Sequence, residues 1–180
     1  TGHERPWHKI PVNRFLAPLL VLMIAAAPSA AADRAVKSPG AGASGLPVPR
    51  FVSLSSDKVN MRAGPGVRYP IAWVYRRKGT PLIVTAEFEY WRKVRDASGT
   101  EGWMHRSLLS GRRMAVVQGK IAVLRRDAST SATPLLRAEP GVLARLQACQ
   151  RGWCRLAFGD REGWLRRDDI FGALPNEDFQ

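Results

Sequence analysis

Short segments of alternating polarity follow one another along the chain from about residue 50. Val, Ile and aromatic residues dominate them, and apolar and polar positions alternate as in half-buried β-strands. The clearest are 70–75 (PIAWVY), 81–88 (PLIVTAEF) and 90–96 (YWRKVRD). Turns are predicted before and after this group of strands, at 63–66 (AGPG) and 96–102 (DASGTEG), because Gly and Pro favour a change of chain direction.

The 3.6-residue period of an amphipathic helix does not occur in this region. Only 105–109 (HRSLL) and 166–170 (RRDDI) predict a helical turn, one each. Units of about sixty residues with about five short strands bury their apolar faces by curling into small barrels. The pattern therefore predicts an all-β protein.

The strand pattern occurs twice, with an offset of 62 residues that aligns Trp91 with Trp153. The same offset pairs Gly79 with Gly141, Val84 with Leu146, and Val94 with Leu156; after a one-residue deletion, Gly102-Trp103 pairs with Gly163-Trp164. A fainter similarity upstream places Arg62 opposite Arg125. Internal duplication predicts two tandem small barrels, 51–113 and 114–172, followed by a tail at 173–180. Units this small are marginally stable alone, so we expect the two barrels to pack together.

The first 32 residues have the organisation of a secretory signal peptide. Lys9 and Arg14 precede a thirteen-residue apolar run, 15–27, and small residues follow it. The alternatives are an uncleaved anchor or a buried helix, but a membrane span needs about 20 apolar residues. Cleavage after Ala32 or Ala31 would leave no stable membrane span. Residues 33–50 are rich in Gly, Ala, Ser and Pro, which predicts a flexible linker.

The chain is strongly basic, with a formal net charge of +13. Residues 1–32 contain three of the 28 basic and one of the 15 acidic residues, so the remainder carries +11. Such a charge attracts polyanions, but export to the periplasm or medium excludes nucleic acid as the natural partner. Basic pairs are spread along the sequence, which favours solvated surfaces over a dedicated binding stripe.

Four segments resemble the bacterial Src-homology-3-like domain family. They are 59–70 (VNMRAGPGVRYP), 78–84 (KGTPLIV), 91–94 (WRKV) and 101–109 (EGWMHRSLL). The second unit keeps only the later part of this pattern. The resemblance implies an exported protein, and some bacterial relatives are wall-binding modules attached to peptidoglycan hydrolases. It favours a non-catalytic module that binds cell-wall peptide or another envelope component. The alternative is a periplasmic structural or protein–protein interaction module with no affinity for wall material.

Aromatic residues are the candidates for ligand binding. Half of Trp73, Tyr75, Trp91 and Trp103 are expected to fill the core, and core packing is the competing explanation for each aromatic residue. The ligand-binding candidates are Tyr69, Tyr90, Trp91 and Trp103. Eukaryotic Src-homology-3 domains bind proline-rich peptides through such aromatic residues. Because the second unit lacks the loop that carries Tyr69, the first is expected to bind. Arg62 and Asn60 are expected to fix this loop.

Cys149 and Cys154 flank a short turn, so they are expected at opposed positions of a hairpin. That distance suits a disulfide, and an oxidising compartment favours one. One alternative is a redox thiol, but the spacing of the two cysteines is not Cys-x-x-Cys. The other alternative is a zinc site that includes His105, but a fourth zinc ligand is not evident. His105 is the only histidine after residue 32. The sequence predicts no catalytic residue, metal or cofactor.

Mass spectrometry of the exported protein is expected to show a chain that starts at Asp33 or Ala32, because the signal peptide is removed. Full-length protein retained in the membrane would contradict this prediction.

Overall fold

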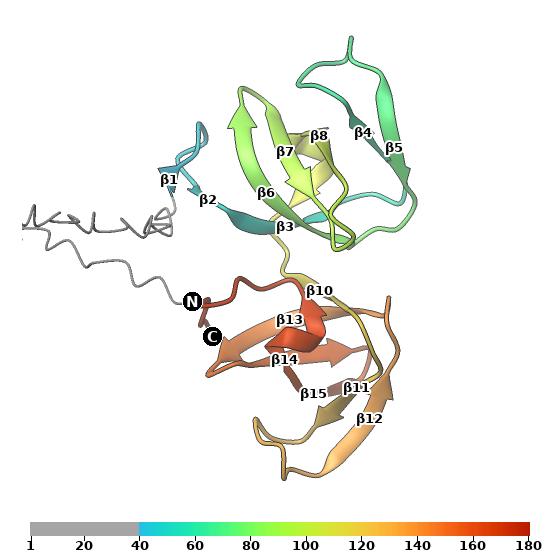
Figure 1. Cartoon of the computed structure of the whole chain (residues 1–180), viewed down its shortest axis with the longest axis vertical. Helices are drawn as coiled ribbons and strands as arrows, with labels where there is room; N and C mark the ends of the chain where they lie inside the picture. The colour runs from blue at the N-terminus through green and yellow to red at the C-terminus, as the bar shows by residue number, and fades with distance from the viewer. Residues whose placement is uncertain (1–39) are drawn as a thin grey trace, which may run out of the picture. The chain divides into compact units, whose positions relative to one another are not determined.

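The computed structural model describes residues 40–180, which form two seven-stranded antiparallel sheets and a short hairpin (Figure 1). The predicted signal peptide, 1–32, lies outside the described residues. The first domain consists of β3 (Arg50–Leu54), β4 (Val59–Arg62), β5 (Ile71–Tyr75), β6 (Pro81–Phe88), β7 (Trp91–Arg95), β8 (Glu101–His105) and β9 (Leu109–Ser110). The second domain consists of β10 (Met114–Val117), β11 (Ala122–Arg125), β12 (Pro134–Ala138), β13 (Leu143–Gln150), β14 (Trp153–Phe158), β15 (Arg161–Arg166) and β16 (Ile170–Phe171).

A single 3₁₀ turn precedes the last strand of each domain. These turns are η1 (Arg106–Leu108) and η2 (Arg167–Asp169), and they confirm the two predicted helical turns. Residues 40–180 contain no helix with the length and apolar composition needed to cross a bilayer.

The two domains have the same topology. Their strand orders are β5-β4-β8-β7-β6-β3-β9 and β12-β11-β15-β14-β13-β10-β16. Val84 pairs with Val94 in the first domain, as Leu146 pairs with Leu156 in the second, and the register shifts directly after each pair. The duplication inferred from the sequence is therefore confirmed down to the position of a β-bulge.

Each sheet bends back on itself at a glycine. Arg62 of β4 pairs with Trp103 of β8, and Arg125 of β11 pairs with Trp164 of β15. A Cβ atom on Gly102 would lie 2.6 Å from Met61 Cγ, and one on Gly163 would lie 2.6 Å from the Arg125 carbonyl oxygen. Glycine is required at both positions because the crossing strands approach so closely.

Each domain has its own hydrophobic core. The first core contains Val52, Leu54, Val59, Met61, Tyr75, Leu82, Val84, Val94 and Met104. The second is built around Leu124, Leu146, Leu156, Leu165 and Ile170, together with the two cysteines. The prediction that half of the four strand aromatics fill the core was wrong, because only Tyr75 is buried. Its hydroxyl donates to Asp96 Oδ2 at 2.8 Å, and burial, followed by this bond, raises the pKa of Tyr75.

The two domains contact each other, as expected for such small units. Phe51 and Phe171 pack edge to face with ring centroids 4.9 Å apart. Arg77 Nη1 donates to the Gly141 carbonyl oxygen at 2.8 Å. Both interactions join residues that are far apart in the sequence, so the domains form one compact unit.

Residues 40–50 are ordered, in contrast to the predicted flexible linker over 33–50; residues 33–39 lie outside the described part. Strands β1 (Gly40–Ala41) and β2 (Pro47–Val48) form a hairpin, and Arg50 already belongs to β3. The hairpin is fixed by Glu87, whose carboxylate accepts from Ser44 N at 2.7 Å and Ser44 Oγ at 2.8 Å. Arg50 and Arg92 also contact Glu87, at 2.6 and 3.0 Å.

The C-terminal residues 173–180 pack on the second domain. Phe179 exchanges two backbone hydrogen bonds with Cys149, each 2.9 Å long, and Arg113 pairs with Glu177 at 2.6 Å. Cys149 and Cys154 lie opposite each other on β13 and β14 and form the predicted disulfide.

Glu87→Gln is expected to lower the free energy of unfolding of the first domain by about 3–5 kcal/mol, because Arg92, whose side chain is 5% exposed, would lose its charge partner. Burial alone would raise the pKa of Glu87, but hydrogen bonds from Ser44 and Arg50 hold this pKa below its ordinary value of 4.5. The stabilisation is therefore complete above pH 4.5 and is lost as the pH falls below it. Urea unfolding and proteolysis within 40–48 measure both effects.

Cleavage within the second domain by the same acid-stable protease, at the same pH, is the control, because it reports acid unfolding of the whole protein. If the hairpin stays protected in Glu87→Gln at neutral pH, the carboxylate does not hold it.

The double variant Cys149→Ser/Cys154→Ser is expected to lose about 2 kcal/mol of stability, because the open loop regains conformational entropy in the unfolded chain. Urea unfolding with and without reductant measures this loss. Reduction of the wild-type protein should reproduce the variant, and an unchanged unfolding midpoint would contradict the prediction.

Candidate functional site

The outer face of β7 and β8 in the first domain gathers most of the candidate residues. Along these strands Val94 and Met104 point into the core and are fully buried, whereas the alternate residues are half-buried or exposed. Since side chains alternate across a strand, Trp91 and Trp103 both lie on the outer face. Part of their apolar surface is therefore available to a ligand, because these two side chains are not buried in the hydrophobic core.

Trp103 lies in a row between two cations. It pairs with Lys93 of β7 on one side and with Arg62 of β4 on the other. Lys93 also contacts Glu101 at 3.0 Å. Arg62 Nη1 donates to the Tyr69 carbonyl oxygen at 2.7 Å, which confirms that Arg62 fixes the loop. This hydrogen bond also places the Tyr69 loop beside the row.

Asn60, expected to share this role, instead pairs with Val74 in the sheet. The half-buried ring of Tyr69 lies against the loop backbone: a Cβ on Gly64 would approach Tyr69 Cδ1 to 2.4 Å. Arg68 lies over the Tyr69 ring, 5.4 Å from its centroid. The predicted loop residue Tyr69 is thus partly packed and partly open to solvent.

Aromatic rings cluster at the end of the same face. The His105 ring lies 5.6 Å from Trp91 and 6.1 Å from Tyr90, measured between centroids. Tyr90 is 57% exposed, and Phe88, which pairs with Trp91, is 51% exposed. His105 Nδ1 accepts from Ser107 N at 3.3 Å and caps η1. His105 therefore has a structural role at the edge of an exposed aromatic surface.

The second domain repeats the row with different surroundings. Trp164 lies between Arg155 and Arg125, and Arg125 Nη1 donates to the Ala132 carbonyl oxygen at 2.8 Å, as Arg62 does to Tyr69. Trp153, the counterpart of Trp91, is buried beneath Arg166. The framework of the site is therefore duplicated, but the aromatic surface is not.

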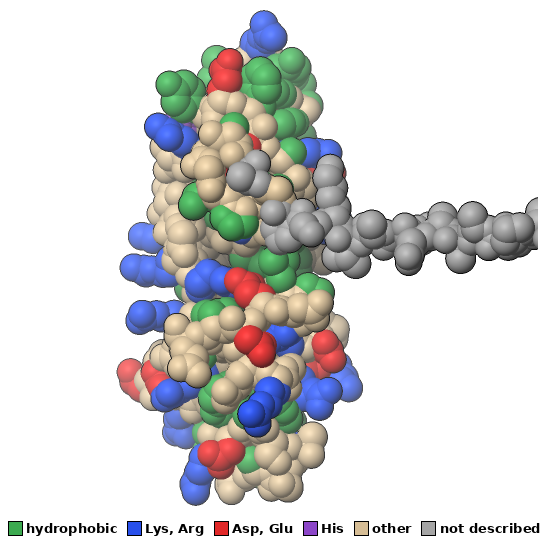
Figure 2. Space-filling model, turned by 90° about the vertical axis from the view of Figure 1, so that its left-hand side faces the viewer, with side chains coloured by type: hydrophobic (Ala, Val, Ile, Leu, Met, Phe, Trp, Pro, Cys, Tyr) green, Lys and Arg blue, Asp and Glu red, His purple; other side chains and the backbone are tan. Residues whose placement is uncertain are grey.

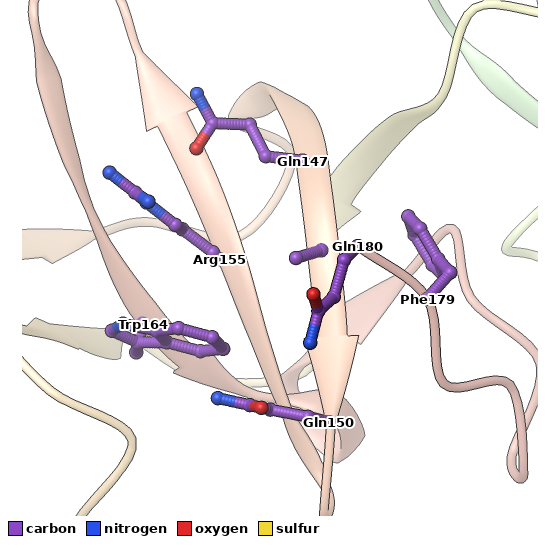
Figure 3. Close-up of a pocket in the computed structure, with 7 residues that line it drawn as sticks. Gln147, Gln150, Arg155, Trp164, Phe179 and Gln180 are labelled. Atoms are coloured by element: carbon purple, nitrogen blue, oxygen red, sulfur yellow. The ribbon is translucent and has the colours of Figure 1, made fainter.

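A cavity of about 440 Å³ adjoins the row of the second domain (Figure 3). It is lined by Gln147, Ala148, Gln150, Arg155, Trp164, Phe179 and Gln180. Gln147 and Arg155 donate to opposite oxygens of Glu162, at 2.6 and 2.8 Å, and these bonds lower the pKa of Glu162, that from Gln147 most. Gln147 Oε1 has no hydrogen-bond partner within residues 40–180. The cavity presents hydrogen-bond donors and an acceptor beside the rings of Trp164 and Phe179.

Basic side chains are dispersed over the molecular surface. Figure 2 shows Lys and Arg on many parts of the face in view, with Asp and Glu between them. Several are paired, among them Arg155 with Glu162 and Lys93 with Glu101. The exposed large hydrophobic side chains are distributed differently: within residues 40–180 they are Leu46, Val67, Ile71, Trp73, Val74, Phe88 and Tyr90, with Ile121 alone in the second domain.

The sequence candidates thus fall into two groups. Tyr90, Trp91 and Trp103 share one face, and Tyr69 comes from the loop that Arg62 ties to it. Sequence reasoning missed Phe88 and the two cations beside Trp103. The alternation of β7 and its pairing with β6 in a two-residue hairpin could have placed Phe88 and Lys93, whereas the position of Arg62 depends on the pairing of β4 with β8.

The disulfide occupies both cysteines, so neither is a free thiol or a zinc ligand. Residues 40–180 contain no cluster of three or more His, Cys, Asp and Glu side chains arranged to hold a metal ion.

Solved structures similar to this chain include NlpC2 and NlpC1 from Trichomonas vaginalis and an NlpC/P60 family protein from Bacillus cereus ATCC 10987. NlpC2 is 11% identical over 73% of this chain and 51% of its own, with a TM-score of 0.34. NlpC1 is 12% identical over 73% and 48%, with a TM-score of 0.33. The Bacillus protein is 13% identical over 67% and 55%, with a TM-score of 0.31. The chain spans about half the length of these structures. No curated protein matches it in sequence.

The family model of the bacterial SH3 domain matches the chain twice, over residues 55–111 and 118–172. Each match covers six of the seven strands of one sheet, because β3 and β10 precede the matched ranges. The protein therefore belongs to the bacterial SH3 domain family and carries two of these domains in tandem.

Proposed function

We propose that this protein is a non-catalytic, exported binding module whose first domain recognises cell-wall peptide or another envelope component. The observation that carries the proposal is the aromatic surface of the first domain, where Tyr90 and Phe88 are exposed beside Trp91 and His105. Aromatic rings bind extended ligands at little entropic cost, because they have few rotatable bonds. Family membership supports the same role, since some bacterial relatives are wall-binding modules.

The row around Trp103 supplies the polar part of this binding face. Lys93 and Arg62 flank the indole, so a carboxylate of a bound peptide would meet a cation on either side of an apolar surface. In the second domain Trp153 is buried and the positions of Tyr69 and Tyr90 are not aromatic. We therefore assign ligand binding to the first domain and a supporting role to the second, which carries the disulfide.

The alternative is a periplasmic interaction module whose partner is another envelope protein. Phe88 and Tyr90 favour it, because large apolar groups exposed at the same turn are typical of protein contacts. Retention on purified peptidoglycan separates the two functions. Retention that survives high salt supports wall binding, whereas salt-sensitive retention reflects only the attraction of a basic protein to an anionic polymer.

Tyr90→Ala and Tyr69→Ala are each expected to weaken salt-resistant retention on peptidoglycan about two- to tenfold, the magnitude of an aromatic contact. The melting temperature should change little in Tyr90→Ala, because an exposed side chain contributes little to the core. Co-sedimentation with purified peptidoglycan and thermal unfolding measure the two quantities.

Trp164→Leu in the second domain is the matched control for Trp103→Leu in the first, because the two residues occupy the same row position. If Trp164→Leu abolishes retention and Trp103→Leu does not, the second domain and its cavity bind the ligand. If Tyr69→Ala unfolds the first domain, that ring belongs to its structure rather than to the binding face.

A further inference from the structure

Strand β5 is the edge of the first sheet. It pairs only with β4, and within residues 40–180 no strand pairs with its other side. One edge of β5 therefore presents backbone N–H and C=O groups to solvent over residues 71–75. Such an edge is a template for an additional strand.

The side chains on this edge are apolar. Ile71, Trp73 and Val74 are 48%, 55% and 36% exposed, and Val67 in the preceding loop is 78% exposed. Proteins usually protect an edge strand with charges, proline or a covering segment. From Ile71 to Val74 the strand carries none of these protections, so the exposed surface is both apolar and able to form hydrogen bonds.

The equivalent edge of the second domain is protected. Strand β12 occupies the same terminal position in its sheet but begins with Pro134, which has no N–H, and carries the exposed Arg137. Leu135 and Leu136 are half-buried rather than exposed. The two domains thus have the same topology but differ at this edge, and only the edge strand of the first domain is unprotected.

The charge around β5 identifies the kind of strand that fits it. The stretch 58–86 contains no Asp or Glu and six basic residues: Lys58, Arg62, Arg68, Arg76, Arg77 and Lys78. Two carboxylates contact the Tyr75 end, Asp57 at Lys78 N and Asp96 at the Tyr75 hydroxyl, and the basic residues outnumber them. A second copy of this chain is disfavoured, because antiparallel pairing centred on Trp73 would bring Arg68 against Lys78 of the other copy. An acidic strand would instead meet complementary charge at both ends of β5.

We propose that the β5 edge binds an extended acidic segment of a partner protein by strand addition, with alternate apolar residues of that segment packed on Trp73, while Val74 lies on the opposite face of the strand. Ile71 adjoins the row around Trp103 through Arg62, but Trp73 lies on the opposite side of the strand from that row, and the mode of binding differs from that proposed for the wall ligand. Backbone hydrogen bonds supply affinity, while the basic flanks select an acidic sequence.

The probe is a fluorescent peptide, acetyl-Asp-Val-Glu-Val-Glu-Val-Asp-amide, titrated with the purified protein at about 0.15 M salt. An analogue N-methylated at alternate residues keeps the charges and side chains but cannot pair along the edge. We expect the analogue to bind at least about tenfold more weakly, because it loses the hydrogen bonds of strand addition. Amide exchange at 71–75 should slow when the unmodified peptide is bound. Fluorescence anisotropy and hydrogen-exchange mass spectrometry provide the readouts.

The double variant Trp73→Ser/Val74→Thr is expected to weaken peptide binding and to leave retention on peptidoglycan unchanged. Ile121→Thr is the control, because it removes an exposed apolar side chain from the second domain, and it should change neither quantity. Equal binding of the N-methylated peptide would overturn the proposal by showing attraction through charge alone. Normal peptide binding by a folded Trp73→Ser/Val74→Thr variant would also overturn it, as would sedimentation showing self-association through this edge. If the double variant does not fold, the two peptides on the wild-type protein decide the question.

Discussion

The close contact of two strands over a single glycine is the constraint on which each domain depends. At Gly102 and Gly163 a strand from the start of the domain crosses one from its end, and no side chain fits between them. At this crossing Met61 lies in the first core and its neighbour Arg62 lies on the outer face, as the alternation of β4 requires. The core, the outer row and the anchor of the Tyr69 loop therefore meet at one close contact. Its repetition explains why Gly-Trp is among the best-preserved features of the duplicated sequence.

The parts of the repeat that do not serve this closure have diverged. Arg125 still donates to a carbonyl oxygen seven residues ahead, as Arg62 does, although the Gly-Pro loop is absent from the second domain. By contrast, Trp91 faces solvent beside His105, whereas Trp153 is covered by Arg166. A framework held by backbone contacts leaves outer-face side chains free to change, since they contribute little to stability.

The sequence was sufficient for features that rest on local periodicity and on the repeat. The strands over 71–75, 81–88 and 91–95, the two helical turns, the domain count and the Cys149–Cys154 pair agree with the prediction, but each domain has seven strands rather than about five. The sequence was insufficient where a residue's role depends on a distant partner. Residues 40–50 have a linker-like composition, and their order comes from Glu87, some forty positions away, which supplies acceptors for Ser44 and Arg50. The inward or outward direction of each tryptophan likewise depended on register across strands.

A bulge in β5 explains how one short strand contributes to two different surfaces. The register between β4 and β5 shifts between Met61 and Arg62, so Trp73 pairs with Met61 while Ile71 pairs with Arg62. Ile71 therefore extends the outer row that contains Trp103, whereas Trp73 lies on the side of Met61 and is exposed where the sheet ends. Bulges turn side chains in this way because one extra residue reverses the alternation of a strand. The second domain has the same shift, between Leu124 and Arg125, but Pro134 and Arg137 occupy its edge strand. The duplicated backbone thus offers the same geometry twice, and side-chain chemistry alone decides which edge can accept a partner.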